Sequence, residues 1–223
     1  MILWLVVVGL AIWLSGSLYL VSYANMWAQN EEPKDPAKLR AEEKSLLGEI
    51  DFQEKFGSKA MDKVRALKRL AFFYLEGKNF AGARDTFLKA ERVLCRDGDT
   101  AVNNSERLVL KRLAAMSMAG CTMFEEAQPL FNQADRLARH LALQQKDSSL
   151  AQAQLLNDEG VYYFLWAGAT KSLHKRKAKY DQAQSFFERA LKCLAGSESQ
   201  DMEETLKANL EQVKREKLFT NFG

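Results

Sequence analysis

Residues 60–95 read AMDKVRALKRLAFFYLEGKNFAGARDTFLKAERVLC, and this stretch decides the fold of the chain. Apolar side chains recur at three and four positions on both sides of Gly77, which is the pattern of amphipathic helices. Gly77, Lys78 and Asn79 interrupt that pattern and mark a turn. The stretch therefore predicts a helix over 60–76, a turn, and a second helix over 80–95.

The face of this second helix returns twice more along the chain. In three segments an aromatic residue is followed at +3 by Ala, at +7 by an aromatic residue and at +10 by Ala. These spacings place the four side chains on one helix face, where the alanines let a neighbouring helix approach closely. Each segment also follows another apolar-periodic segment. The three sets are Phe80, Ala83, Phe87, Ala90; Phe124, Ala127, Phe131, Ala134; and Tyr180, Ala183, Phe187, Ala190.

The repeated hairpins resemble tetratricopeptide repeats over residues 62–195. The resemblance implies an all-α solenoid, whose first helices line a concave groove that binds peptides or helices of other proteins. The first aromatic residues of the repeated face, Phe80, Phe124 and Tyr180, are 44 and 56 residues apart, against a repeat of about 34 in the family, so the connections are longer. The residues of the first unit that match are Leu70, Ala71, Tyr74, Phe80, Ala83, Phe87 and Ala90.

The whole chain is expected to be all-α: a tetratricopeptide-like solenoid of helical hairpins preceded by one N-terminal transmembrane helix. The repeats fall at about 60–95, 104–145 and 148–195, and the second helix of the last one is expected near 177–195. The predicted parts are an anchor over 1–28, a linker over 29–37, a leading helix over 38–58, three repeats over 59–195 and a capping helix over 196–223.

The N-terminal segment is strongly apolar. Residues 1–30 carry no charged side chain, and residues 2–23 are almost wholly hydrophobic. As a helix they would rise about 33 Å, enough to cross a hydrocarbon core of about 30 Å. A cleaved signal peptide is the main alternative, because Ser22-Tyr23-Ala24 resembles a cleavage site, and a buried core helix is a further one. The absence of a preceding Lys or Arg and the length of the run favour a retained membrane anchor.

Two features bear on the side of the membrane that the repeats occupy. Lys34, Lys38, Arg40 and Lys44 follow the apolar segment, and positive residues collect on the cytoplasmic side. The three cysteines form an odd set at wide spacing, which favours reduced thiols. Both features favour a single-pass membrane protein with a cytoplasmic repeat domain over an extracytoplasmic one.

The composition excludes several kinds of site. The chain has 223 residues, 32 Lys and Arg against 29 Asp and Glu, and 2 His. This net charge of +3 is not that of a general nucleic-acid binder, and two separated histidines form no metal-binding motif. The sequence contains no phosphate-binding glycine loop or nucleophile elbow, and its adjacent glutamates point to different helix faces and form no paired-carboxylate site. We therefore expect no enzyme activity, no cofactor and no bound metal or nucleic acid.

What remains is a surface for another protein. Carried over by position from the family, the groove mixes cations with apolar side chains and would suit a partly acidic, partly apolar segment. Each of these positions can equally be a core residue or a solvated one. The predicted groove residues are Arg65, Lys68, Phe72, Leu75, Arg112, Met116, Asn157, Val161 and Phe164.

A basic cluster lies in the third unit, where residues 171–179 hold five cations and no acid. Tyr163 and Tyr180 are 17 residues apart, where the family would place them about six apart, so the cluster fills an insertion of about three helical turns. A solvated helix extension is one interpretation, and contact with an acidic protein or anionic lipid is another. Nucleic acid is disfavoured because no aromatic residue lies among the charges. The cluster is Lys171, Lys175, Arg176, Lys177 and Lys179.

The function expected from these features is a non-catalytic, membrane-anchored scaffold or adaptor that binds another protein. One alternative is a translocated repeat domain that assists the assembly or folding of envelope proteins. Another is binding of an anionic lipid surface through residues 171–179.

Overall fold

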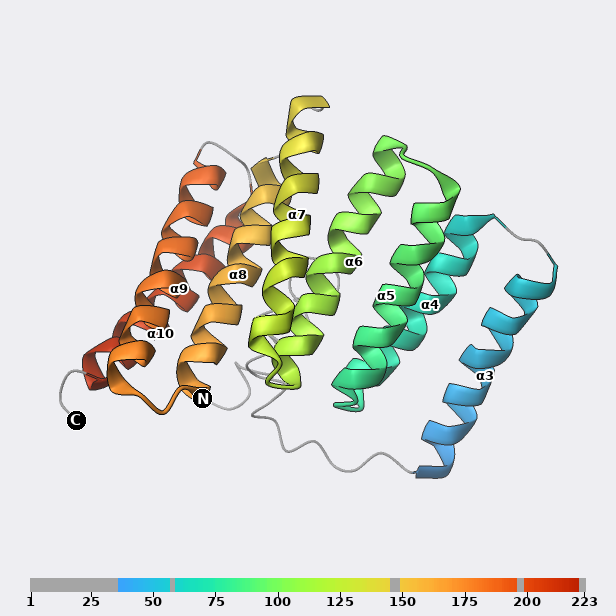
Figure 1. The fold of residues 1–223 in the computed structure, drawn as a ribbon, viewed down its shortest axis with the longest axis horizontal. Helices are drawn as coiled ribbons and strands as arrows, with labels where there is room; N and C mark the ends of the chain where they lie inside the picture. The colour runs from blue at the N-terminus through green and yellow to red at the C-terminus, as the bar shows by residue number, and fades with distance from the viewer. Residues whose placement is uncertain (1–35, 57–58, 145–148, 196–198, 221–223) are drawn as a thin grey trace. The chain divides into compact units, whose positions relative to one another are not determined.

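The computed structural model describes residues 36–56, 59–144, 149–195 and 199–220, which form helices joined by short turns (Figure 1). The prediction of an all-α fold is confirmed for this part of the chain. The helices are α3 (Pro36–Lys55), α4 (Ala60–Glu76), α5 (Phe80–Asp97), α6 (Ala101–Gly120), α7 (Phe124–Gln144), α8 (Ser149–Ala169), α9 (Leu173–Leu194) and α10 (Gln200–Thr220).

The predicted anchor over 1–28 and most of the linker over 29–37 lie outside the described residues. Among the helices that are described, none combines the length and the hydrophobicity needed to span a bilayer.

The helices belong to two compact units. In the first unit, within residues 32–148, α3 packs on α4, α4 on α5, α5 on α6, and α6 on α7. In the second unit, whose described residues lie within 149–220, α8 packs on α9, α9 packs on α10, and α10 also touches α8. Within each unit, helices that follow one another run antiparallel, so consecutive helices form hairpins (Figure 1).

The turns of the first two hairpins share one backbone geometry, 44 residues apart. Lys78 after α4 and Thr122 after α6 have φ angles of 56° and 61°, in the left-handed region. In each turn the N–H of the next residue donates to the carbonyl oxygen five residues before it, at 2.8 and 3.0 Å. Such a left-handed residue satisfies the last carbonyls of the helix and reverses the chain. The repeat seen in the side chains is therefore also present in the backbone.

Two helices of the first unit begin at capped residues. The Asn79 side-chain oxygen accepts a hydrogen bond from the Gly82 N–H at the start of α5, at 3.0 Å. The Thr100 hydroxyl oxygen accepts one from the Asn103 N–H at the start of α6, also at 3.0 Å. Each cap satisfies an amide that has no carbonyl partner within its helix.

The face that repeats in the sequence forms the core. Phe124 at the start of α7 and Tyr180 in the third turn of α9 are buried, and Phe80 at the start of α5 is half-buried. The alanines and the second aromatic residue of each set are at most 1% exposed: Ala83, Phe87, Ala90, Ala127, Phe131, Ala134, Ala183, Phe187 and Ala190. The prediction that these side chains pack against a neighbouring helix is confirmed.

Most of the basic segment 171–179 lies within a helix, in agreement with the interpretation of a helix extension. The second helix of the third hairpin was expected near 177, but α9 begins at Leu173 and α8 ends at Ala169. The inserted residues therefore continue the helix, because nothing in the segment breaks it, and only residues 170–172 form the turn. Most of the basic cluster thus lies in the first two turns of α9.

Candidate interaction surfaces

More than half of the predicted groove residues are buried. Leu75 on α4, Arg112 and Met116 on α6, and Asn157 and Val161 on α8 are each at most 8% exposed. These residues were predicted from their positions on the first helix of each unit. Such a position does not show which side of the helix a neighbouring helix buries. Little of the surface of these side chains is therefore accessible to a docked segment.

The other predicted groove residues are accessible in part. Arg65 is exposed, and Lys68, Phe72 and Phe164 are half-buried. Lys68 Nζ lies 2.5 Å from Glu106 Oε1, an ion pair that joins α4 to α6. The ring of Phe72 meets an aromatic ring of α5 edge to face, with 5.5 Å between the centroids. Partner binding by these four side chains stays a prediction.

The capping helix reaches a predicted groove residue in the second unit. Asn209 Nδ2 on α10 donates a hydrogen bond to Asn157 Oδ1 on α8, at 2.9 Å. Leu206 and Val213, about one turn to either side of Asn209, are at most 1% exposed. α10 therefore packs by an apolar stripe and by a hydrogen bond from the half-buried Asn209 to the buried Asn157.

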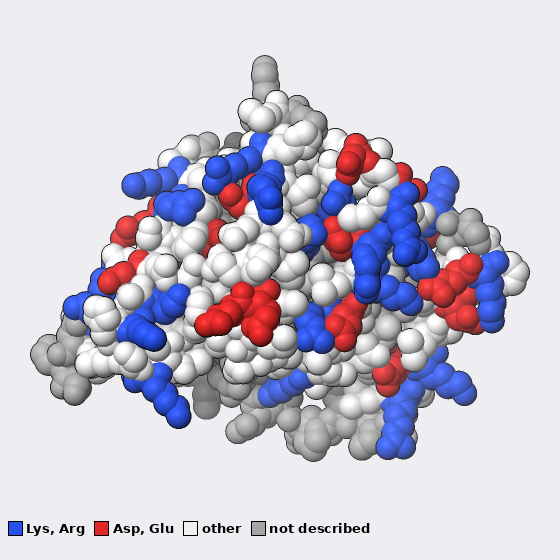
Figure 2. Space-filling model, viewed as in Figure 1, with Lys and Arg blue, Asp and Glu red and all other residues white. Residues whose placement is uncertain are grey.

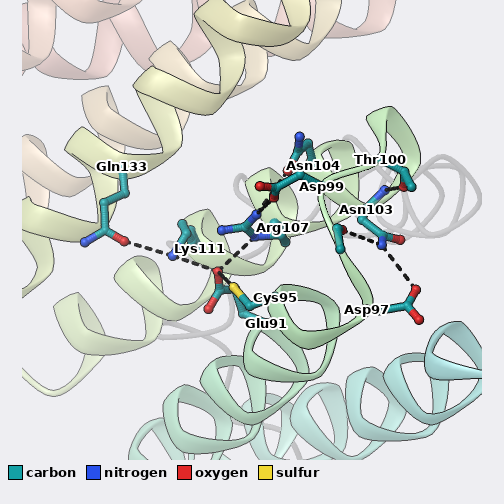
Figure 3. Close-up of polar contacts among 11 residues, drawn as sticks. Glu91, Cys95, Asp97, Asp99, Thr100, Asn103, Asn104, Arg107, Lys111 and Gln133 are labelled. Atoms are coloured by element: carbon teal, nitrogen blue, oxygen red, sulfur yellow. Dashed lines mark hydrogen bonds and ion pairs between the residues drawn. The ribbon is translucent and has the colours of Figure 1, made fainter.

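The most extensive polar cluster of the first unit joins α5, α6 and α7 (Figure 3). Glu91 is 6% exposed, and its Oε1 accepts from Arg107 Nε at 3.2 Å, from the Cys95 thiol at 3.0 Å, and from Lys111 Nζ at 2.9 Å. Lys111 Nζ also donates to Gln133 Oε1 of α7, at 2.8 Å. One carboxylate oxygen thus gathers donors from two helices, and a lysine extends the contact to a third.

The protonation states in this cluster follow from its contacts. Burial raises the pKa of Glu91, but the bonds from Cys95, Lys111 and Arg107 outweigh it, so the pKa lies below its ordinary value. Burial and the bond to Glu91 raise the pKa of the Cys95 thiol. Glu91 is therefore charged and Cys95 is a neutral thiol at pH 7, which suits a structural role in holding three helices together.

The cluster continues to the start of α6 (Figure 3). Arg107 Nη1 bonds Asp99 at 2.7 Å and Asn104 at 3.1 Å. Asn103 Nδ2 bonds the carbonyl of Gly98 at 2.9 Å and the Asp97 carboxylate at 3.2 Å. The α5–α6 turn is therefore held by side chains of α6, a feature that the sequence analysis missed. The sequence could have indicated this cluster, because Arg107 and Lys111 lie four residues apart and therefore share one face of a helix.

The basic cluster divides into two groups in the structure. Lys171, Lys175 and Lys177 are exposed at the α8–α9 end, where Lys and Arg side chains project from the viewed face (Figure 2). Arg176 Nε donates to a carbonyl oxygen of the turn at 2.9 Å. Lys179 Nζ lies 3.3 Å from the centre of the Trp166 ring, a cation–π contact. Two of the five cations thus fasten the hairpin, and three face outward.

The aromatic partners of Lys179 were also missed. Its Nζ lies 5.0 Å from the centre of the Tyr163 ring, and this ring stacks on Phe186 of α9 with 5.3 Å between centroids. No aromatic residue lies within 171–179, but an antiparallel pair that turns at residue 171 places residue 163 opposite residue 179. This signal was lost because the predicted start of α9 was too late.

Further exposed cations lie on α5, namely Lys89, Arg92 and Arg96. Figure 2 shows a dense group of Lys and Arg side chains over α4 and α5, with acidic side chains beside it. Glu54 at the end of α3 pairs with Lys63 at 2.8 Å and with Lys89 at 3.3 Å. The cations of this face are thus partly neutralised.

In the described ranges, no group of three or more His, Cys, Asp or Glu side chains is placed to hold a metal ion. Comparison with protein-family models and with curated proteins finds no match for this chain. The contacts of the described helices show a fold in which helices pack in consecutive pairs.

Proposed function

We propose that this chain is a non-catalytic, membrane-anchored scaffold or adaptor, built from tetratricopeptide-like hairpins that hold another protein. The observation that carries the proposal is the repeated hairpin: the α4–α5 and α6–α7 turns have the same backbone bonds and the same buried Ala and Phe positions, 44 residues apart. Stacked hairpins form extended, rigid surfaces, and binding is the use such surfaces serve.

The outer face of α4 is the part of this surface best suited to a partner. Arg65 is exposed and bonds only to a side chain of its own helix, Asp62, at 3.0 Å, as far as the described residues show. Lys68 and Phe72, one and two turns further on, keep part of their surface accessible. A cation, a second cation and an aromatic ring on one face would suit a segment that carries both acidic and apolar side chains.

The proposed anchor is the uncharged segment 2–23, and the cations after it favour a cytoplasmic repeat domain. Protease protection of a C-terminal tag in intact and opened cells tests the location. Protection in intact cells at full-length mass supports the proposal. Digestion from outside would favour the alternative of a translocated repeat domain that assists envelope proteins, and a mass smaller by about 2–3 kDa would show a cleaved signal peptide.

Site-specific photo-crosslinking tests the binding face. A photoreactive residue in place of Arg65 on α4 is compared with one in place of Arg92, an exposed position on the other helix of the same hairpin. We expect discrete crosslinked partners from position 65 and none from position 92. Equal crosslinking from both, or none from either in a correctly folded chain, would reject binding at the α4 face.

A further inference from the structure

We propose that the tip of the α8–α9 hairpin, residues 170–177, docks on the headgroups of an anionic bilayer. Lys171, Lys175 and Lys177 contact the lipid phosphates, and Leu173 enters the interface between headgroups and acyl chains. The choice of a bilayer as the partner rests on the membrane anchor of the proposed function.

The first argument is the charge of the tip. Lys171, Lys175 and Lys177 are exposed, and none has an ion pair among the residues that the structure describes. The next acid along the chain, Asp181, is bound by Lys217 of α10 at 2.5 Å. The first turn of α9 contains no acidic residue, so the positive end of the helix dipole adds to the charge of the lysines. An anionic surface is therefore attracted here without first displacing a described acidic partner.

The second argument is the apolar side chain among these charges. Leu173 is 48% exposed and lies at the first position of α9, between Lys171 and Lys175. One exposed leucine alone is ordinary. A leucine flanked by lysines at the end of a hairpin can place its apolar atoms below the headgroups while the ammonium groups stay at phosphate level.

The third argument is that the tip is held in shape. Arg176 Nε donates to the Thr170 carbonyl at 2.9 Å, and the Thr170 hydroxyl donates to the Trp166 carbonyl at 2.7 Å. Lys179 is held over the ring of Trp166 by its cation–π contact. The backbone that carries the outward lysines is thus ordered before binding, which lowers the entropy lost on docking.

A planar bilayer fits this tip better than an acidic protein does. The described tip ends a helical hairpin (Figure 1), and its exposed lysines lie before and after one exposed leucine along the chain, which allows both kinds of side chain to meet a bilayer surface. The proposed anchor over 2–23 would keep the domain within reach of the bilayer. A purely acidic peptide would satisfy the lysines but would leave Leu173 without an apolar partner.

The test uses the full chain in nanodiscs of phosphatidylcholine alone and of phosphatidylcholine with phosphatidylglycerol. Acetylation of each lysine by a water-soluble ester is followed by mass spectrometry. We expect the rates at Lys171, Lys175 and Lys177 to fall roughly fivefold in the anionic nanodiscs, and to recover near 1 M salt. Lys192 is the control, because it is exposed at the other end of α9, and its rate should not change.

A variant checks that these lysines cause the docking. K171A/K175A/K177A leaves Arg176 and Lys179 to hold the turn, and circular dichroism confirms its helices. Hydrogen exchange of residues 170–178 should slow in anionic nanodiscs for the natural chain and not for the variant. Rates that do not differ between the two lipid mixtures would overturn the proposal, and so would protection by an acidic peptide but not by anionic lipid.

The experiment also distinguishes a chain without a membrane anchor from a chain whose tip does not dock. A chain that does not enter neutral nanodiscs and is extracted from them by alkaline carbonate lacks the proposed anchor. If that chain still binds anionic nanodiscs through the three lysines, tip docking holds and the anchor of the proposed function does not. If the chain stays in neutral nanodiscs and its lysines react alike in both mixtures, the anchor holds and tip docking is rejected.

Discussion

The ring of Phe187 on α9 lies directly against the backbone of Gly160 on α8. A Cβ at residue 160 would come within 2.5 Å of Phe187 Cε1, closer than such atoms approach. The same relationship joins Phe80 on α5 to Gly120 on α6, where the added Cβ would lie 2.7 Å from the ring. In both pairs an aromatic ring fills the place of a missing side chain, which brings the helices close together.

Gly160→Ala should therefore destabilise the second unit. Alanine favours a helix by about 1 kcal/mol over glycine, but the clash with a buried ring costs about 1–3 kcal/mol or more. We expect a net loss in the free energy of unfolding, measured by urea unfolding with circular dichroism. Gly168→Ala is the control in the same helix, because nothing lies within 4 Å of its added Cβ. A control that loses as much stability as Gly160→Ala would show that the contact with Phe187 is not the cause.

Thr122→Gly should stabilise the first unit. Thr122 has a φ of 61°, where a β-branched side chain clashes with its own backbone and glycine does not. Glycine also makes the unfolded chain more flexible, which offsets part of the benefit. We therefore expect the free energy of unfolding, measured by thermal or urea unfolding, to rise by about 0.5–1 kcal/mol.

Replacing another threonine by glycine should have the opposite effect on stability. Thr100 has a φ of −89° and caps α6 with its hydroxyl, so Thr100→Gly should lower stability by about a few tenths of a kcal/mol. If Thr122→Gly also lowers stability, the left-handed turn is not strained in the way proposed.

Glu91→Gln should loosen the packing of α5, α6 and α7. The variant removes a buried carboxylate from Arg107 and Lys111 and leaves their charges poorly compensated. We expect a loss of about 2–4 kcal/mol. Glu211→Gln, which breaks an exposed pair with Lys214, should change stability by less than about 1 kcal/mol.

The effect of Glu91 should also depend on pH. Its pKa is lowered in the folded chain, so its charge stabilises the fold above its ordinary pKa of 4.5, and this contribution is lost as the pH falls through the folded pKa. Acid unfolding of the natural chain should show this loss, and the Glu91→Gln variant should show less of it. Equal acid sensitivity in the two chains would contradict the assignment.

Tyr74→Phe should loosen α3 from α4. The Tyr74 hydroxyl donates to Glu43 Oε1 of α3 at 2.8 Å, and burial together with this bond raises the pKa of Tyr74 to about 12. The neutral phenol therefore stabilises the fold below its ordinary pKa near 10, and this contribution is lost as the pH rises through about 12. We expect a loss of about 1 kcal/mol and faster hydrogen exchange in α3 at neutral pH.

A substitution of Glu43 separates the effect of its charge from that of its hydrogen bond with Tyr74. Glu43→Gln keeps an acceptor but removes the negative charge, so the ultraviolet titration of Tyr74 should shift to lower pH. A titration that stays unchanged in Glu43→Gln would show that burial alone raises the pKa of Tyr74.

Much of the helical architecture could be predicted because its causes are local. The three- and four-residue periodicity around Gly77, and the recurrence of Ala and Phe at Ala83, Phe87 and Ala90, depend only on neighbours in the chain. Helix ends were less predictable. α9 begins at Leu173, before the predicted start near residue 177, because Lys175, Arg176 and Lys177 are compatible with a helix.

The candidate surface was predicted less well than the fold. Arg112 and Met116 share the helix of the predicted groove, yet both are buried, since burial depends on which neighbouring helix covers that side. Asn157 was expected to face a partner and instead accepts a bond from Asn209, more than 50 residues away. Spacing along one helix contains no information about such distant neighbours.

The sequence by itself determined that the described chain is helical, that its helices form hairpins, and which small and aromatic residues face inward. These properties follow from the period of the α-helix and from turn residues, which act over a few positions. Only the tertiary structure decided that Glu91 gathers donors from α5 and α6, and that Lys179 covers Trp166 while three nearby lysines face outward. Those contacts join residues of different helices, and they form only when packing brings the helices to within a few ångströms of each other.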